Sequence, residues 1–165
     1  MPFELRPYPT PTLRPEGAYL QNAWRNSIYP LAARMGIDIR LPDVSPQPYT
    51  RLAFEGLEFA KAHALGNEYN SEVMRAFFQR SEDIGDPEVL THIARNVGLD
   101  AKLFQQALQN RTYTAQVEKL LRHASEDIGV TGVPLFLVGG RQLRGLQSAE
   151  NLKAAIDQET ASKNR

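Results

Sequence analysis

The hydrophobic pattern of this chain changes from a helical period to a short strand-like run near residue 130, and that change restricts the fold more than any other feature. From Glu16 to about Gly129, apart from an extended piece at Ile37–Leu41 and the proline-rich loop after it, apolar residues recur at the 3.6-residue spacing of amphipathic helices. Leu135–Val138 is then a short apolar run, Gly139–Gly140 is a two-residue hairpin turn, and Arg141–Arg144 is the returning strand. The sequence therefore predicts an α/β protein in which helices dominate.

Polar residues mark where several of these helices begin. Asp86 followed by Pro87 combines an N-cap with a proline at the first helical position, which is a strong start signal. Asp100 and Thr50 can cap two further helices, and Ser148 can cap a final helix after the hairpin. The pattern predicts a block of several helices followed by a hairpin and one more helix.

The residues before the first helical pattern have a different, strand-like pattern. Phe3–Tyr8 alternates apolar and polar residues before two prolines, which predicts one short strand. A helical pattern follows, and Pro30 should break or kink it. Pro42 and the prolines after it mark a loop before the long helical block.

Composition excludes several functions for this chain. Its 165 residues include no cysteine, which excludes a disulfide framework, a zinc-thiolate site, a cysteine nucleophile and a self-contained dithiol redox centre. The 19 basic side chains balance the 19 acidic ones, so we expect neither a nucleic-acid partner nor an anionic membrane partner. No secretory signal or long apolar stretch is visible, and a cytoplasmic location is expected.

A few polar side chains are candidate site residues. His63, His92 and His123 lie on predicted helices without metal-ligand spacing, which favours solvated or core-edge histidines and no metal site. Glu55 and Glu58 are one helical turn apart and could form a general-base pair, but a solvated helix face is the favoured interpretation. No catalytic residue is assigned.

The segment Gly129–Gly140 carries the most information. A proline directly before a strand is unusual because the first strand amide would otherwise pair. A cis Val133–Pro134 bond would leave the Val133 amide and carbonyl free to face a ligand. A trans proline that begins an edge strand is the other interpretation, and local sequence alone leaves both open.

Gly129–Phe136, the Gly-rich hairpin after it and the helix start at Gly145–Ser148 together resemble the C-terminal half of the DsbA-like thioredoxin-fold family. Asp83–Leu90 resembles a phrase that joins two helices of the inserted helical domain in that family. The resemblance runs from Phe3 to about Ile156, and it favours a cis bond before Pro134.

The resemblance implies a domain layout. It predicts a thioredoxin-like core from residues 1–41 and 129–160, an all-helical inserted domain at 42–128, and a frayed tail at 161–165. Phe3–Tyr8 resembles the family's second strand, so the core is expected to be incomplete: the first strand and the Cys-X-X-Cys helix have no counterpart here. A segment of that kind upstream of Met1 would overturn this expectation.

The resemblance implies kinship with thiol–disulfide oxidoreductases, whereas the missing cysteines predict that this chain alone is redox-inactive. We expect it to bind an extended peptide or a glutathione-like backbone, with no other cofactor. The ligand-binding residues implied are Thr131, Gly132, Val133, Pro134, Gln147 and Ser148.

Two alternatives remain open. One is a glutathione-dependent isomerase or transferase, in which the thiol of glutathione supplies the chemistry. The other is a non-catalytic subunit that completes a redox protein made of two pieces. Because an incomplete sheet has unpaired edges, either self-association or a partner chain that supplies the missing strand is expected.

Overall fold

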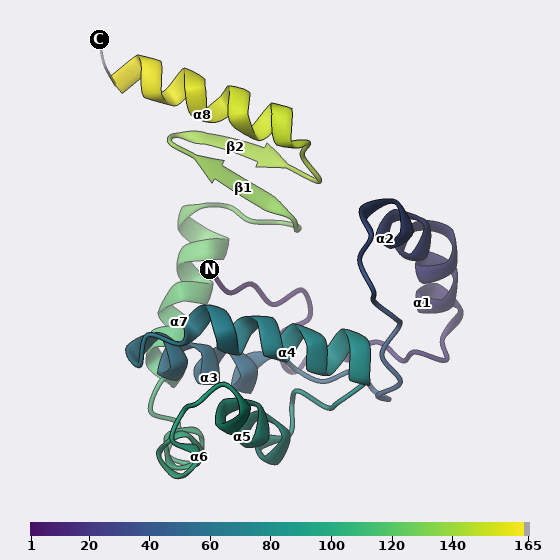
Figure 1. Cartoon of the computed structure of the whole chain (residues 1–165), viewed down its shortest axis with the longest axis vertical. Helices are drawn as coiled ribbons and strands as arrows, with labels where there is room; N and C mark the ends of the chain where they lie inside the picture. The colour runs from purple at the N-terminus through teal and green to yellow at the C-terminus, as the bar shows by residue number, and fades with distance from the viewer. Residues whose placement is uncertain (164–165) are drawn as a thin grey trace. The chain divides into compact units, whose positions relative to one another are not determined.

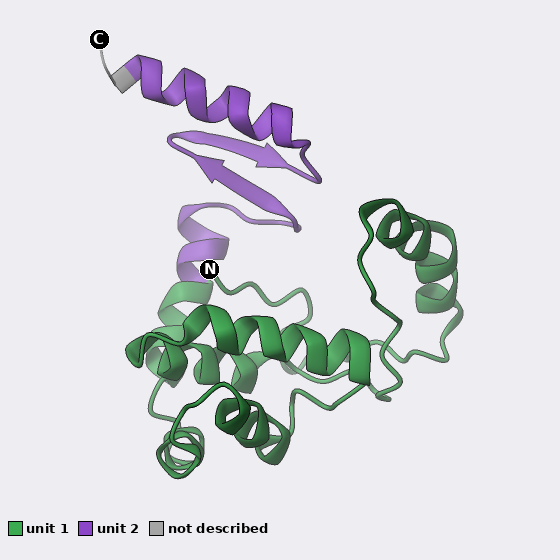
Figure 2. Cartoon of the chain, in the orientation of Figure 1, with its two compact units in different colours: residues 1–121 green, residues 122–165 purple. Residues whose placement is uncertain are grey.

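The computed structural model describes residues 1–163, and its elements are mostly helical, as Figure 1 shows. The chain forms two compact units, residues 1–121 and residues from 122 onward, coloured separately in Figure 2. Unit 1 contains α1 (Ala18–Ala23), the π-helix η1 (Trp24–Ile28), α2 (Tyr29–Met35), α3 (Arg51–Ala62), α4 (Gly66–Arg80), α5 (Pro87–Asn96), α6 (Ala101–Gln109) and most of α7 (Thr114–Arg122). Unit 2 contains the π-helix η2 (His123–Asp127), β1 (Leu135–Val138), β2 (Arg141–Arg144) and α8 (Ala149–Lys163).

The hydrophobic core of unit 1 lies among α3, α4, α5 and α6. Tyr69, Leu90, Ile93 and Phe104 are fully buried there. The rings of Phe59 and Phe104 meet edge to face, with centroids 5.3 Å apart. The apolar positions predicted from the 3.6-residue period therefore form the core of a helical block.

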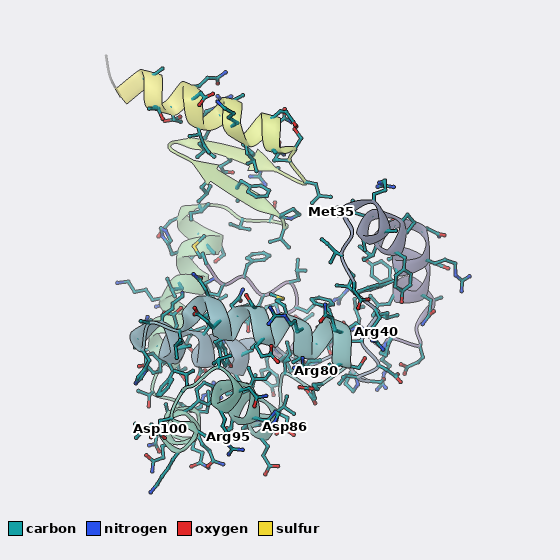
Figure 3. The ribbon with its side chains drawn as sticks, in the orientation of Figure 1. Met35, Arg40, Arg80, Asp86, Arg95 and Asp100 are labelled. Atoms are coloured by element: carbon teal, nitrogen blue, oxygen red, sulfur yellow. The ribbon has the colours of Figure 1, made fainter. Side chains whose placement is uncertain are left out.

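Two of the predicted N-caps are confirmed by their hydrogen bonds. Asp86 Oδ1 accepts from the Glu88 amide at 2.8 Å, and Asp100 Oδ1 accepts from the Lys102 and Leu103 amides at 2.9 Å. Figure 3 labels both aspartates at the starts of their helices. Thr50 precedes α3 as predicted, but its side chain makes no capping hydrogen bond.

The strand predicted at Phe3–Tyr8 is wrong, because this segment has no regular secondary structure. Its Glu4 carboxylate binds the Arg51 guanidinium through two hydrogen bonds, of 2.8 and 3.2 Å. The Tyr8 ring packs against Tyr49, with centroids 5.7 Å apart. An extended backbone is stabilised by hydrogen bonds to a neighbouring strand, and no such strand pairs with this segment within residues 1–163. Side-chain contacts within unit 1 hold the segment instead.

Pro30 does not break the helical segment that contains it. The backbone N–H of Tyr29 bonds the Trp24 carbonyl, five residues back, in the π-helical turn η1. This wide turn absorbs the steric conflict of Pro30 with the preceding turn, and α2 then ends at Gly36 in the left-handed conformation.

Unit 2 is a hairpin with a helix along it (Figure 1). β1 and β2 pair antiparallel, with Leu135 opposite Arg144 and Val138 opposite Arg141, which confirms the predicted hairpin. Ser148 precedes α8 and accepts a hydrogen bond from the Asn151 amide at 3.1 Å, as its predicted capping role requires.

The compact units group residues 1–41 with the helices of unit 1. The layout expected above, a core of 1–41 and 129–160 around an insertion at 42–128, stays a prediction. α8 extends through Lys163, so the helix continues into the segment expected to fray, and residues 164–165 lie outside the described residues. None of the helices described is both long enough and apolar enough to span a membrane.

Candidate functional site

The two segments that hold the predicted ligand residues are joined within unit 2. The Gly145 amide donates to the Pro134 carbonyl at 2.9 Å, which continues the hairpin ladder past Leu135 and Arg144. Arg144 Nη1 donates to Thr131 Oγ1 at 3.1 Å. The loop before β1 and the turn after β2 therefore lie side by side, and residues 131–134 and 147–148 come together.

Three of the predicted ligand side chains are engaged in local hydrogen bonds. Thr131 accepts from Arg144, and Gln147 Nε2 donates to the Arg144 carbonyl at 2.9 Å. Ser148 caps α8. These contacts position the backbone of the two segments, so the groups that remain available to a ligand are mainly those of Gly132, Val133 and Pro134.

The electrostatics of this turn come from the first residues of α8. Hydrogen bonds from its own backbone amide and from Ser148 lower the pKa of the Glu150 carboxyl. Glu150 is in the first turn of α8, where a carboxylate also interacts favourably with the helix dipole. The side chains of Ser148 and Glu150 thus interact with the first turn of α8.

The loop before β1 is open. Residues 131–134 are all exposed, and the Val133 side chain is 53% exposed. The Val133–Pro134 peptide bond is cis. None of the 165 residues given is a cysteine, and the loop offers backbone hydrogen bonds and apolar contacts.

Unit 1 has cavities that sequence reasoning did not identify. One, of about 550 Å³, is lined by Glu4, Tyr8, Pro48, Tyr49, Arg51, Leu52, Asp83, Gly85 and Arg111. A hydrogen bond to Glu4 raises the pKa of Arg51, and Glu118 lies 3.6 Å from the same guanidinium. The pairing of Glu4 with Arg51 joins residues 47 positions apart, a separation at which the sequence carries no local signal.

Glu55 and Glu58 are buried rather than solvated, so the favoured interpretation of this helix face is wrong. Glu55 is 1% exposed and its Oε1 accepts from Arg111 Nη2 at 2.7 Å. Glu58 is 5% exposed and is bonded by Lys61 and Gln116. Each carboxylate is committed to a basic or amide partner, which indicates a structural role instead of a general-base pair.

The three histidines are placed separately. His63 Nδ1 lies 2.8 Å from the Phe59 carbonyl, His92 contacts Asn96, and His123 pairs with Asp127. Across residues 1–163, no group of three or more histidine, cysteine, aspartate or glutamate side chains is arranged to hold a metal ion.

Comparison with known proteins agrees with this architecture. The chain is 44% identical, over 164 residues, to the uncharacterised protein YwbO of Bacillus subtilis, and the match covers 99% of this chain and 82% of the relative. A probable DsbA oxidoreductase of Streptomyces coelicolor superposes with a TM-score of 0.75 at 25% identity. That match covers 88% of this chain, but the chain spans only 62% of the Streptomyces protein.

A 2-hydroxychromene-2-carboxylate isomerase shares the fold, with a TM-score of 0.70, 17% identity, and coverage of 88% of this chain and 70% of the isomerase. The model of the DsbA-like thioredoxin domain matches residues 2–157. Because this match covers nearly the whole chain, which folds into a helical block, a hairpin and a following helix, the chain belongs to the DsbA-like thioredoxin domain family.

Proposed function

We propose that this chain is a binding member of the DsbA-like family that takes an extended peptide or a glutathione-like backbone along residues 131–134. The observation that carries the proposal is the open loop before β1, whose residues are all exposed and whose continuation, within residues 1–163, pairs with β2 only. A ligand in extended conformation can hydrogen-bond to such a backbone, and pockets beside it can select side chains. A cytoplasmic location is part of the proposal.

The positioning contacts support this site. Arg144 links the two segments by donating to Thr131 and by accepting from Gln147 through its carbonyl. Because these side chains are already hydrogen-bonded, the loop is pre-organised, and a ligand would lose little affinity to ordering it.

The test is a titration followed by amide chemical shifts in ¹⁵N-labelled protein. The probes are reduced glutathione and a reduced, carboxymethylated unfolded protein. We expect saturable shifts at Thr131, Gly132 and Val133 with at least one probe. Arg144→Met should weaken that binding because it removes the link to Thr131, whereas Arg95→Met, an exposed change on α5, serves as the matched control and should leave it unchanged. Shifts confined to unit 1, or none, would contradict the proposal.

Redox activity is tested separately on the same material. Because the chain has no cysteine, we expect no reduction of insulin disulfides above background without an added thiol. Turnover that begins only when glutathione is present would favour the second candidate, a glutathione-dependent isomerase or transferase. The likeness to the isomerase is one of fold, so this candidate stays second. Co-purification of a chain that restores redox activity would favour the third, a subunit of a two-piece redox protein.

A further inference from the structure

Another cavity of unit 1, of about 610 Å³, shares no lining residue with the one described above. Its walls come from the segment before α1, from the helical stretch α1–η1–α2, and from the loop after α2. Trp24 and Tyr29 line it together with the charged side chains of Glu16, Arg25 and Asp43. A cavity of this size, with aromatic walls and a few polar groups, is typical of sites for small ligands.

The π-helical turn η1 brings Trp24 and Tyr29 to the same cavity. In a regular α-helix, residues five positions apart are rotated by about 140° around the axis and face different sides. Here the Tyr29 amide bonds the Trp24 carbonyl, and this wider turn sets the two residues on one side of the helix. Their rings meet edge to face, with centroids 5.4 Å apart. Turns of this kind are frequent at functional sites, and this one provides two adjacent aromatic walls.

Hydrogen bonds fix the walls of this cavity. Gln21 Nε2 donates to the Pro15 carbonyl at 2.7 Å, which ties α1 to the segment before it. The Leu41 amide donates to the Tyr29 hydroxyl at 3.2 Å, which ties the loop after α2 to that helix. Because the Tyr29 hydroxyl is the acceptor in this bond, its own proton stays available to a ligand. The walls are thus in place before a ligand binds, which lowers the cost of binding.

Acidic and basic groups line the cavity without pairing with each other. Hydrogen bonds from its own backbone amide and from Ser45 lower the pKa of Glu16, so this carboxylate is ionised at neutral pH. Asp43 and Arg25 are both exposed and line the cavity, yet neither forms an ion pair with any of residues 1–163. The cavity therefore presents a carboxylate and a guanidinium, both unpaired within these residues, beside its aromatic rings.

We propose that this cavity binds a small zwitterion, a molecule with one ammonium group and one carboxylate such as a free amino acid or a betaine. The carboxylates of Glu16 and Asp43 attract the ammonium group, and the ring of Tyr29 adds a cation–π contact. The Arg25 guanidinium binds the carboxylate of the ligand. A purely anionic ligand would meet two carboxylates and a purely cationic one would meet Arg25, so both fit less well. The proposal is independent of the ligand proposed for residues 131–134.

Fluorescence titration of the full chain tests the site, because Trp24 is the single tryptophan among the 165 residues. The probes are free glycine and glycine betaine as zwitterions, choline with the ammonium group alone, and propionate with the carboxylate alone. Calorimetry of the same titrations detects binding that leaves the fluorescence unchanged. We expect saturable binding of at least one zwitterion, about tenfold tighter or more than that of choline or propionate. Equal binding of choline or propionate, or no binding of either zwitterion, would overturn the proposal.

Matched variants locate the binding. Asp43→Asn and Arg25→Gln each remove one charge from the cavity, and each should weaken binding of the zwitterion by about tenfold. Asp38→Asn and Arg34→Gln are the controls, because these residues are equally exposed and charged but do not line the cavity. We expect the controls to bind within about twofold of the parent chain. All four side chains are exposed, so far-UV circular dichroism should show the same fold throughout. Equal losses in the variants and their controls would overturn direct contact with Asp43 and Arg25.

Discussion

The hydroxyl of Tyr69 on α4 lies directly against the Cα of Gly56 on α3. A Cβ at position 56 would collide with this hydroxyl, and it would also lie 2.8 Å from Tyr69 Cζ and 2.7 Å from Phe104 Cζ. Such distances are shorter than carbon atoms allow without movement. α3 can therefore approach α4 and α6 this closely because position 56 has no side chain.

We predict that Gly56→Ala destabilises the protein by about 2 kcal/mol. Alanine favours the helix by up to about 1 kcal/mol over glycine, but overpacking against two fully buried rings outweighs this gain. Urea unfolding measures the change. Gly140→Ala is the control, because nothing lies within 4 Å of a Cβ there, and its effect should stay within about 0.5 kcal/mol. A neutral Gly56→Ala would show that the helices can move apart freely.

Tyr69→Phe should stabilise the protein by up to about 1 kcal/mol at neutral pH. The Tyr69 hydroxyl is buried, and no side chain or backbone group in residues 1–163 forms a hydrogen bond with it, so it loses its hydration on folding without compensation. The comparison is made by urea unfolding of the two proteins side by side. A large destabilisation would mean that the hydroxyl has a partner in solution.

The same residue predicts how stability depends on alkaline pH. Burial raises the pKa of Tyr69 above its ordinary value of 10.0, because the phenolate cannot be solvated inside the core. The unfolded chain releases this proton near pH 10 and the folded chain does not, so the stability present below pH 10 is lost as the pH rises above it. Tyr69→Phe should flatten this slope in unfolding measured on both sides of pH 10. If the dependence of stability on pH stayed unchanged in Tyr69→Phe, groups other than Tyr69 would be responsible for it.

The buried ion pair of Glu55 and Arg111 predicts non-additive mutations. Arg111→Met removes the cation that hydrogen-bonds the buried Glu55 carboxylate, and we expect a loss of about 2 kcal/mol, because Arg111 itself is about half exposed. The double variant Glu55→Met/Arg111→Met should recover most of this loss, since the Glu55 carboxylate is then no longer buried without its partner. A double-mutant cycle by urea unfolding measures the coupling. Purely additive losses would contradict the pairing.

The helix caps give a graded comparison. Asp86→Ala and Asp100→Ala should each cost about 1 kcal/mol, because each removes a carboxylate that binds a first-turn amide. Thr50→Ala should change stability by less than about 0.5 kcal/mol, since the Thr50 side chain makes no capping bond. Thermal unfolding ranks the three variants. Equal losses at all three positions would mean that helix propensity, rather than capping, decides them.

Local signals in the sequence predicted the features that local physics determines. Asp86 before Pro87, Asp100 and the turn Gly139–Gly140 each have a conformational preference within a few residues, and each was found where expected. The prediction of a strand at Phe3–Tyr8 was wrong because alternation alone does not make a strand. A strand also needs a neighbour, and Glu4 instead binds Arg51.

In the candidate site, too, some features could be predicted from the sequence and others could not. The family resemblance implied that residues 131–134 and 147–148 bind a ligand, which stays a prediction, and the Gly145–Pro134 hydrogen bond joins the two segments that hold them. The engagement of Thr131 with Arg144 could not be predicted, because it depends on a rotamer set by the hairpin. The burial of Glu55 was missed for a similar reason: its partner Arg111 is 56 residues away, and a glutamate without a visible partner reads as solvated.

The π-helical turn at Trp24–Ile28 has a consequence for how chains of this kind change in length. A regular helix tolerates deletions poorly, because the loss of one residue rotates every later side chain by about 100° around the axis. The turn at η1 already contains one residue more than a regular turn needs, since the Tyr29 amide reaches five residues back. Removal of one residue here would restore an ordinary turn and leave α1 and α2 facing as they do now. Alignments of related sequences should therefore accept a one-residue gap inside this helical segment as readily as a gap in a loop.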